Sequence, residues 1–445
     1  MKKGFEMKYF PLLKKSIQNL NLLRKLMQLS RRDILHKRLH LVLIILFAVT
    51  FPFHIQVSNI FFIAFAANWL LEGNLLKKLS IAVNNKWVLL FSGFYLLHIV
   101  GLLFSSNIGD GLFDLEKKAA LFAFPFILVS VNFTIKQVHY IILSFIIACF
   151  ILTAVCFAFA AYQWLENNTT EFFFSQELAL TVDIHRVYLS MYLLFCIFSL
   201  LYIKSHIRLW KQFFINAVTW FLIIYFLITI FLLGSRILIA LTLISSIIYI
   251  AWYVYRYKKV IAGLSVLFVI FLLVSLTIYH SERYRTLFRE LYTDLDKGKT
   301  EFNTTGPNLR LEVWKNVKEL LKEKWYGVGT GDVTDELVVV YKRNEFNLGA
   351  EARLNAHSQY LETWLGLGPI GLFTLLAGFI FPLYWSFKRG NYYYGSYIIL
   401  FAIVCFTESL LCRNKGIMFY GLFNSLFIFA FFCGQKNQAE FNGKA

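Results

Sequence analysis

Apolar runs of membrane-spanning length recur along nearly all of the 445-residue chain. A helix needs about 20 apolar residues to cross a hydrocarbon layer of about 30 Å, and by this criterion we count about twelve runs. With 58% hydrophobic and 16% charged residues, the sequence predicts an all-α polytopic membrane protein and excludes an ordinary soluble domain. The predicted spans are residues 39–55, 57–72, 87–104, 117–131, 138–162, 187–204, 214–233, 236–255, 260–279, 369–387, 392–411 and 416–433.

Positive charge is concentrated ahead of the first apolar run. Residues 1–38 carry eleven Lys or Arg against two acidic residues, a surplus of nine out of a net charge of +18. Leu13, Ile17, Leu20 and Met27 recur there at helical spacing. This pattern predicts a basic amphipathic segment on the cytoplasmic surface of an anionic bilayer. A nucleic-acid partner is not favoured, because the basic residues are not interleaved with exposed aromatic residues in a soluble domain.

The short basic connectors set the topology. Connectors after the second, sixth, eighth and tenth spans are rich in Lys and Arg, so the positive-inside rule places both termini in the cytoplasm. Residues 163–186 and the long polar stretch after the ninth span then lie outside. The predicted parts are residues 1–38, nine helices within 39–279, an outer loop domain at 280–367, three helices within 368–433, and a tail at 434–445. Within the loop, Leu309–Trp325 has the pattern of an amphipathic helix lying over the outer opening of the bundle.

His357 lies near the end of this outer loop, where chemistry can meet water. Its ordinary pKa near 6.5 makes it a candidate proton acceptor, and the alternative is a hydrogen-bonded interfacial histidine. Residues Ser358–Leu365 are expected to form a short helix that Gly366 and Gly368 end, with Pro369 in the first turn of the tenth span.

Two arginines at the outer surface are candidates for binding phosphate. In Gly234-Ser235-Arg236, Ser235 can cap the next helix, so that free backbone N–H groups and a guanidinium converge. Arg310, at the start of the amphipathic helix, is suited to a second bidentate contact with a diphosphate. The alternatives are a snorkelling arginine at position 236 and a solvated helix charge at position 310.

Weaker signals surround these candidates. His185 and Arg186, in the smaller outer loop, could line the same cavity, and Arg353 is a further cation, although for each a solvated or structural role is the simpler interpretation. Asp294 and Asp296 form a DxD pattern that some glycosyltransferases use for a metal, yet no further oxygen ligands can be assigned, so no metal site is predicted. The GxGxG at Gly327, Gly329 and Gly331 has no βαβ context and does not indicate a nucleotide fold. The cysteines have no CxxC spacing and are interpreted as core residues.

The order of these features resembles the O-antigen ligase and polymerase family. The likeness covers roughly residues 100–433 and includes the glycine-rich segment Tyr326–Gly331. His357-Ser358, nine residues and then Gly368-Pro369-Ile370-Gly371 match the pattern of the ligase branch, although Leu372 and Phe373 stand where that branch often has threonines.

This resemblance implies a glycosyltransferase with a GT-C-like fold in the bacterial inner membrane, with its active site facing the periplasm. The enzyme would move a glycan from undecaprenyl diphosphate to a sugar hydroxyl of the lipid A core, with inversion and without a metal, ATP or other cofactor. By position, Arg236 and Arg310 match the family's diphosphate-binding pair and His357 matches its histidine.

Two other functions remain open from the sequence. A polymerase of the same family would join glycan units still attached to the lipid carrier, and it differs mainly in the acceptor. A transporter or flippase of lipid-linked glycans would show ionisable residues or broken helices near the bilayer midplane, whereas the informative charges here cluster at the outer surface. A scaffold without activity would leave the spacing of the motifs unexplained.

Overall fold

The computed structural model describes residues 31–206, 213–258 and 307–433, and within these ranges every regular element is helical. Residues 31–50 form the first helix. The first group of helices after it is α2 (Ile55–Leu71), α3 (Leu75–Val83), α4 (Lys86–Leu102), α5 (Ile108–Val131), α6 (Ile135–Asn167), the 3-10 turn η1 (Glu171–Phe173), α7 (Ser175–Leu180), α8 (Arg186–His206), α9 (Phe213–Leu233) and α10 (Arg236–Tyr257). The second group is α13 (Pro307–Glu323), α14 (Val333–Arg343), α15 (Asn347–Glu351), α16 (Gln359–Lys388), α17 (Tyr392–Val404), the 3-10 turn η3 (Leu410–Cys412), α18 (Asn414–Ile428) and the π-helical turn η4 (Phe429–Cys433).

Several of these helices are long and apolar enough to cross a membrane, which confirms a polytopic membrane protein. Within the described residues six qualify, or up to seven if α2 and α3, which are bent by 111°, form one broken span. The predicted number of about twelve is not confirmed, because α4 and α17 are shorter apolar helices. The predicted span 260–279 and most of the basic segment 1–38 lie outside the described residues.

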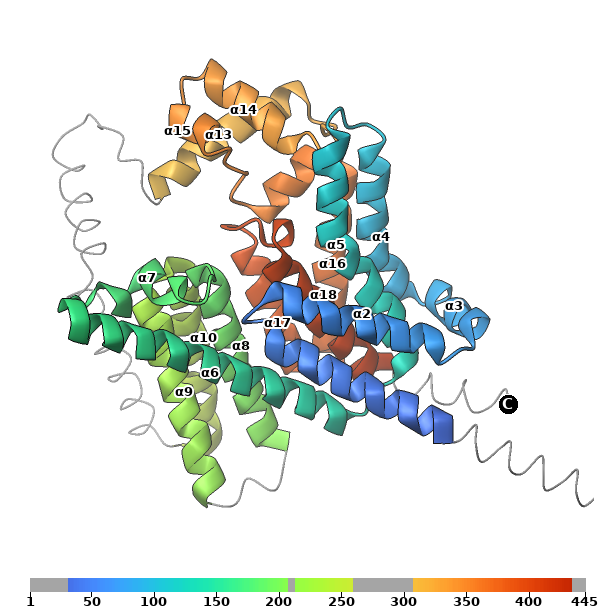
Figure 1. The fold of residues 1–445 in the computed structure, drawn as a ribbon, viewed down its shortest axis with the longest axis vertical. Coiled ribbons are helices and arrows are strands. Elements are labelled where there is room, and N and C mark those ends of the chain that lie inside the picture. The colour runs from blue at the N-terminus through green and yellow to red at the C-terminus, as the bar shows by residue number, and fades with distance from the viewer. Residues whose placement is uncertain (1–30, 207–212, 259–306, 434–445) are drawn as a thin grey trace, which may run out of the picture.

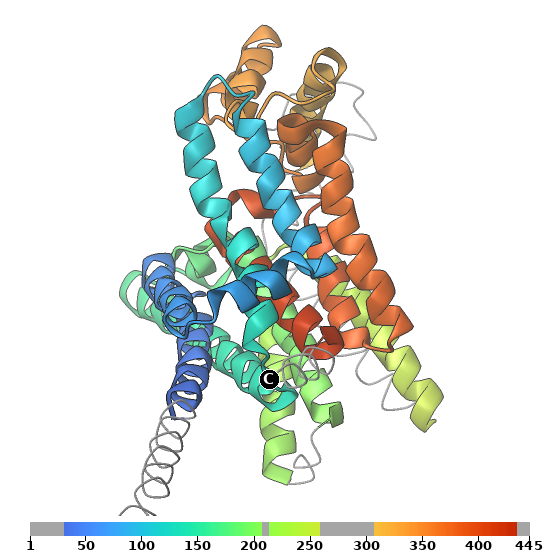
Figure 2. The same cartoon turned by 90° about the vertical axis from the view of Figure 1, so that its right-hand side faces the viewer.

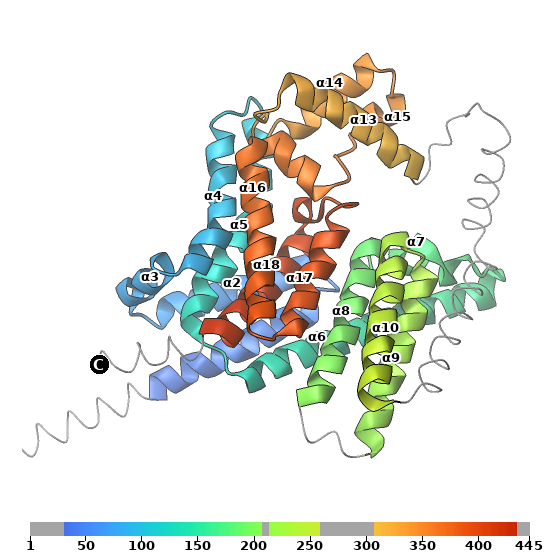
Figure 3. The same cartoon turned by 180° about the vertical axis from the view of Figure 1, so that it is seen from behind.

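The helices form two groups joined by a core of aromatic side chains. One group holds α6 to α10, and the other is built from α4, α5 and α16 to α18 (Figures 1 and 3). Between them, Phe195 of α8 packs against Tyr397 of α17 and against Phe419 and Phe423 of α18, with ring centroids 4.6–5.6 Å apart. Aromatic pairs at such distances add specific packing to the burial of apolar surface, and so they fix the two groups against each other.

The outer segment 307–358 lies across one end of the molecule, above α16 and α5 (Figures 1 and 2). Val313, Val317 and Leu320 of α13 are buried and pack with Leu337 and Tyr341 of α14 in a small core of their own. The amphipathic helix that the sequence predicts at Leu309–Trp325 is therefore confirmed as α13, since its apolar stripe is the buried face.

Two helix ends differ from the predicted spans, both next to the outer segment. Helix α5 begins at Ile108 instead of residue 117, because the Asn107 side chain accepts a hydrogen bond from the Asp110 N–H and caps it. Helix α17 ends at Val404 instead of residue 411, and residues 405–413 leave the helix as turns and η3. The polar contacts made by this last segment, described below, explain why the apolar run does not continue as a helix.

Candidate active site

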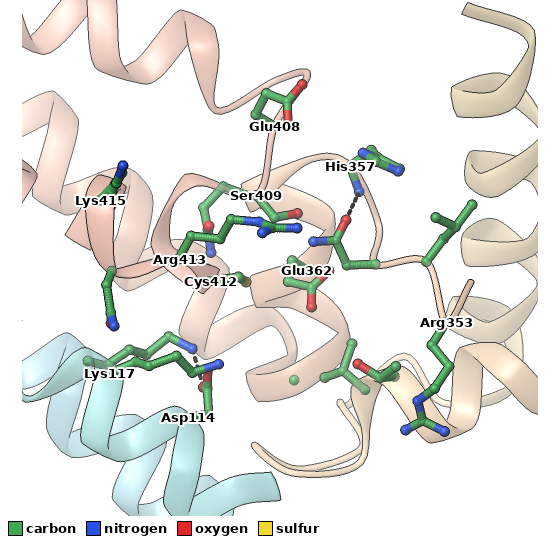
Figure 4. A pocket seen from close by; sticks show the side chains of 18 of the residues that line it. Asp114, Lys117, Arg353, His357, Glu362, Glu408, Ser409, Cys412, Arg413 and Lys415 are labelled. Carbon is green, nitrogen blue, oxygen red and sulfur yellow. Dashed lines mark hydrogen bonds and ion pairs between the residues drawn. The ribbon is translucent and has the colours of Figure 1, made fainter. Parts of the chain in front are cut away.

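A cavity of about 900 Å³ lies between the outer segment and the ends of the helices below it. Its walls come from α5, from residues 176–188 around α7, from residues 352–367 and from residues 408–415. Figure 4 shows charged side chains from several of these elements facing one another across this cavity, with His357 on one side and Arg413 and Lys415 on another. Titratable groups from sequence-distant elements therefore share one partly open, partly polar space.

His357 lines the cavity from the short connection ahead of α16. Its backbone is held at φ 47°, in the left-handed region that few residues other than glycine adopt, while its N–H donates to Asn355 Oδ1 at 3.1 Å. Its ring Nε2 is buried and has no hydrogen-bond partner among the described residues. Burial, reinforced by the positive charges of Arg310 and Arg413, lowers the pKa of His357 to about 4. The imidazole is therefore neutral at pH 7 and can accept a proton.

Polar contacts lock the chain on both sides of His357. Glu362 Oε2 accepts the N–H of Ala356 at 2.8 Å, so the connection closes onto the first turn of α16. The N–H of Gln359 donates to the carbonyl of Cys405 at 2.8 Å, and its side-chain Oε1 accepts the N–H of Leu411 at 2.6 Å. The Cys405 carbonyl and the Leu411 N–H are thus satisfied by Gln359 at the start of α16, which holds the segment after α17 in a non-helical path.

Two features fix the start of α16 next to the site. They are a break within this helix and the glycine-rich segment Tyr326–Gly331, which binds to it. Gly368 has φ 65° and ψ −164°, a conformation open essentially to glycine, and it divides α16 as the sequence predicts. The N–H groups of Val328 and Gly329 donate to the carbonyls of Leu365 and Gly366, at 2.7 and 3.0 Å. The GxGxG segment therefore packs against the break, and the described elements around it are helices, with no βαβ unit among them.

Arg310 is not among the described residues that line the cavity, but it forms an ion pair with Glu408, at 2.5 Å between Nη2 and Oε1. Glu408 lines the cavity, and burial raises its pKa above the ordinary value although Arg310, Arg186 and Arg413 act in the opposite direction. The structure thus brings Arg310 and Arg186 together around one buried carboxylate.

His185 belongs to the same cluster, as the sequence analysis considered. It lines the cavity, and burial, followed by Arg186, Arg413 and Arg310, lowers its pKa to about 4. Arg186 donates to Ser175 Oγ at 2.6 Å, which fixes it beside α7. His185, Arg186, Arg310 and His357 therefore gather at one place from three separate parts of the chain.

The other predicted residues stand apart from this cluster. Ser235 is buried at the N-cap position of α10 but makes no side-chain capping bond, which corrects the expected role. Neither Ser235 nor Arg236 is among the described residues that line the cavity. Arg353 lines it, but pairs with Asp335 at 2.6 Å and approaches Asp110 at 3.9 Å. This pairing favours the structural interpretation of Arg353.

Glu408 and Arg413 are among the site residues that the sequence reasoning missed. Glu408 is an acidic residue inside an apolar run, and an ionisable residue at such a position is by default a functional candidate. Arg413 and Lys415 form a basic pair in a connector that the predicted topology places outside, against the usual distribution of charge. Both signals were present in the sequence.

Within the described residues, no group of three His, Cys, Asp or Glu side chains is placed to hold a metal ion. Asp294 and Asp296 lie outside the described residues. The described cysteines, Cys149, Cys156, Cys196, Cys405 and Cys412, are free thiols.

The fold and the cavity together define a polytopic membrane protein with a polar, arginine-containing site at one end of its helices. Residues 221–376 match the family model described as O-antigen ligase. The match spans about a third of the chain, and it supports the resemblance to the O-antigen ligase and polymerase family for this segment. The matched segment includes Arg236, Arg310 and His357, while His185, Glu408 and Arg413 lie outside it. A comparison with curated proteins finds no match to the chain.

Proposed function

We propose that the protein is a glycosyltransferase of the inner membrane that moves an O-antigen glycan from undecaprenyl diphosphate to a sugar hydroxyl of the lipid A core on the periplasmic face. One observation carries the proposal most directly. The neutral histidine of the family pattern, His357, lines a cavity that is also lined by Arg413 and by Glu408, the ion-pair partner of Arg310. The family match supports the same class of substrate.

The charges of the site suit a diphosphate leaving group. As the bond between the anomeric carbon and the diphosphate oxygen breaks, negative charge grows on that oxygen. Fixed cations in a poorly solvated place stabilise such charge as it develops. Arg310 is held by Glu408 at 2.5 Å, and Arg413 acts electrostatically on the same carboxylate. Both are therefore close enough to share one anionic group.

His357 is proposed to take the proton of the acceptor hydroxyl. The hydroxyl oxygen attacks the anomeric carbon, its proton passes to Nε2, and undecaprenyl diphosphate leaves with the bonding electrons. Nε2 suits this role because it has no hydrogen-bond partner among the described residues and belongs to a residue that lines the cavity. The donor's negative charges oppose those of Arg310 and Arg413, so donor binding is expected to raise the pKa of His357 and make it a stronger base. Direct displacement inverts the anomeric configuration.

The test replaces His357 by alanine and measures glycan transfer in membrane vesicles. We expect the rate to fall by roughly 10²- to 10⁴-fold, the usual contribution of a positioned general base. His54→Ala is the matched control, since His54 is exposed at the turn between the first helix and α2 and does not line the cavity. Transfer by His357→Ala at the wild-type rate would refute the proposal.

The second candidate function is the polymerase, favoured by the fact that the matched family model does not separate the two activities. Deleting the gene and examining surface glycolipid on a gel distinguishes them. A ligase predicts lipid A core without long glycan while polymer remains on the carrier lipid. A core that carries a single repeat unit would indicate a polymerase. If the deletion strain loses export of the lipid-linked glycan together with its transfer, the transporter alternative is indicated.

A further inference from the structure

The turn that enters α18 concentrates positive charge on the cavity. Arg413, Asn414 and Lys415 all line it, at the end of the molecule covered by the outer segment (Figure 4). In the predicted topology this short connector lies on the outer side, where short connectors usually carry few basic residues. Basic residues in an outer connector run against the usual distribution of charge across a membrane, and binding of an anion would explain them.

Two carboxylates that line the cavity with Arg413 are bound by other groups. Glu408 is held by Arg310 at 2.5 Å, and Glu362 Oε2 accepts the N–H of Ala356 at 2.8 Å. Among the described residues no ion pair or side-chain hydrogen bond of the Arg413 guanidinium is seen, although its charge acts on Glu408, His357 and His185. The Arg413 guanidinium is thus available to an anion within the cavity.

The first turn of α18 adds backbone donors to this cation. The helix runs from Asn414 to Ile428, and its first residues line the cavity next to Arg413, so the partial positive charge of its N-terminus lies at the cavity wall. The turn is closely packed, because a Cβ at Gly416 would approach the carbonyl oxygen of Leu410 to 2.1 Å. Lys415 is tied down as well, with its Nζ donating to the carbonyl of Asp183 at 2.9 Å.

Ser409 supplies an independent sign of a ligand. Its side chain is 4% exposed and lines the cavity, and its hydroxyl Oγ is buried without a hydrogen-bond partner among the described residues. A buried hydroxyl that lacks a partner costs roughly 1–3 kcal/mol, so such groups are normally satisfied. A bound phosphate oxygen in the cavity would satisfy it.

We propose that Arg413, the Ser409 hydroxyl and the first turn of α18 form a binding site for the diphosphate of the lipid-linked donor. In this arrangement Arg413 shares the diphosphate with Arg310, which is joined to the cavity wall through Glu408. This assignment rests on the proposed function, because a lipid diphosphate is the donor there. It extends the site beyond the segment matched by the family model, which ends at residue 376.

The test measures equilibrium binding of undecaprenyl diphosphate to the purified full-length protein in nanodiscs, separately from transfer. We expect Arg413→Ala to weaken binding by roughly tenfold or more, as for loss of a charge-assisted contact. Arg413→Lys should retain part of the affinity, and Ser409→Ala should lose a few-fold. Arg389→Ala is the matched control, since Arg389 stacks on Trp385 at the far end of α16 and should leave binding unchanged. Thermal unfolding of each variant, measured alongside, identifies any loss of binding that comes from misfolding.

The outcomes separate this inference from the function on which it rests. If the wild type binds the lipid diphosphate and Arg413→Ala binds it equally well, the site assignment is wrong while the proposed function stands. A tenfold loss in Arg236→Ala without one in Arg413→Ala would also overturn it. A wild type that does not bind the lipid diphosphate at all would overturn both. Inorganic pyrophosphate bound as tightly as the lipid would mean that the site accepts a soluble diphosphate, which overturns the assignment to the donor.

Discussion

At the scale of single residues, His357 owes its chemistry to its surroundings more than to its own side chain. Histidine ordinarily titrates near 6.5, but burial and two arginines lower the pKa of this one to about 4. The local chain enforces the position, since a left-handed backbone at residue 357 persists only where neighbouring contacts fix it. Those contacts include the bond from the Ala356 N–H to Glu362.

This lowered pKa predicts an unusual pH profile. The imidazole of His357 accepts a proton only as the pH falls toward 4. Its neutral form, which acts as the base, therefore persists at pH values near 6.5 and below, where an ordinary histidine becomes protonated. We expect kcat/KM for transfer, which reports the free enzyme, to stay within about twofold between pH 8 and pH 6. His54→Ala should give the same profile. An acid limb with a midpoint near 6.5 would contradict the burial of His357 in the active protein.

The interaction partners seen in the structure change the interpretation of Arg353, Glu408 and Arg413. Arg353 lines the cavity, but Asp335 neutralises it at 2.6 Å, and hydrogen bonds from Asn107 and Arg353 lower the pKa of Asp335. Glu408 and Arg413, which the sequence reasoning passed over, form the centre of the cluster. The residue types alone do not show which of these side chains can act on a substrate, because ion pairing decides which charges remain available.

At the scale of elements, the break in α16 connects the outer segment to the membrane helices. Gly368 and Gly327 allow two backbones to approach each other, since a Cβ at Gly368 would lie 2.1 Å from the carbonyl oxygen of Tyr326. A second anchor joins the same segment to the turn between α4 and α5, where Asp332 accepts the N–H groups of Ser106 and Asn107 at 2.7 Å. The segment above the cavity is therefore fixed at two points.

The break gives a prediction for Gly368→Ala. Both the disallowed backbone conformation and the clash with Tyr326 oppose a side chain, so we expect a loss of stability of at least about 1–3 kcal/mol and a marked fall in transfer. Gly93→Ala in α4 serves as control, because a Cβ there meets nothing within 4 Å. Unfolding followed by tryptophan fluorescence in detergent measures both variants. Equal unfolding temperatures would show that the break is not required.

At the scale of the whole molecule, the outer segment and the cavity lie at the end that the charge distribution places outside. The basic Lys388 and Arg389 lie at the far end of α16 from His357, with Gly368 between them. This separation along one long helix is expected if the two ends face opposite sides of a bilayer.

The orientation is tested by labelling single cysteines in a background in which the native cysteines are replaced by serine. Lys342 and Lys388 are both exposed, one in the outer segment and one at the far end of α16. We expect Lys342→Cys to react with a membrane-impermeant thiol reagent in spheroplasts, and Lys388→Cys to react only after permeabilisation. The reverse pattern would place the cavity in the cytoplasm and contradict the proposed periplasmic reaction.

Much of this architecture was predictable from local sequence. The apolar periodicity fixed the helical class, the stripe of α13 and the position of His357 beside a glycine-broken helix, because each depends on residues within a few turns of one another. The early end of α17 was not predictable in this way. The place of Glu408 and Arg413 in the charged cluster was not predictable in this way either. They depend on contacts such as that between Arg310 and Glu408, which are 98 residues apart in the chain. The sequence by itself determined which segments are apolar and which residue types could do chemistry. Only the tertiary structure decided which charges are paired, which are buried and which line the cavity. The physical reason is that desolvation and ion pairing arise between segments that meet only in the folded protein.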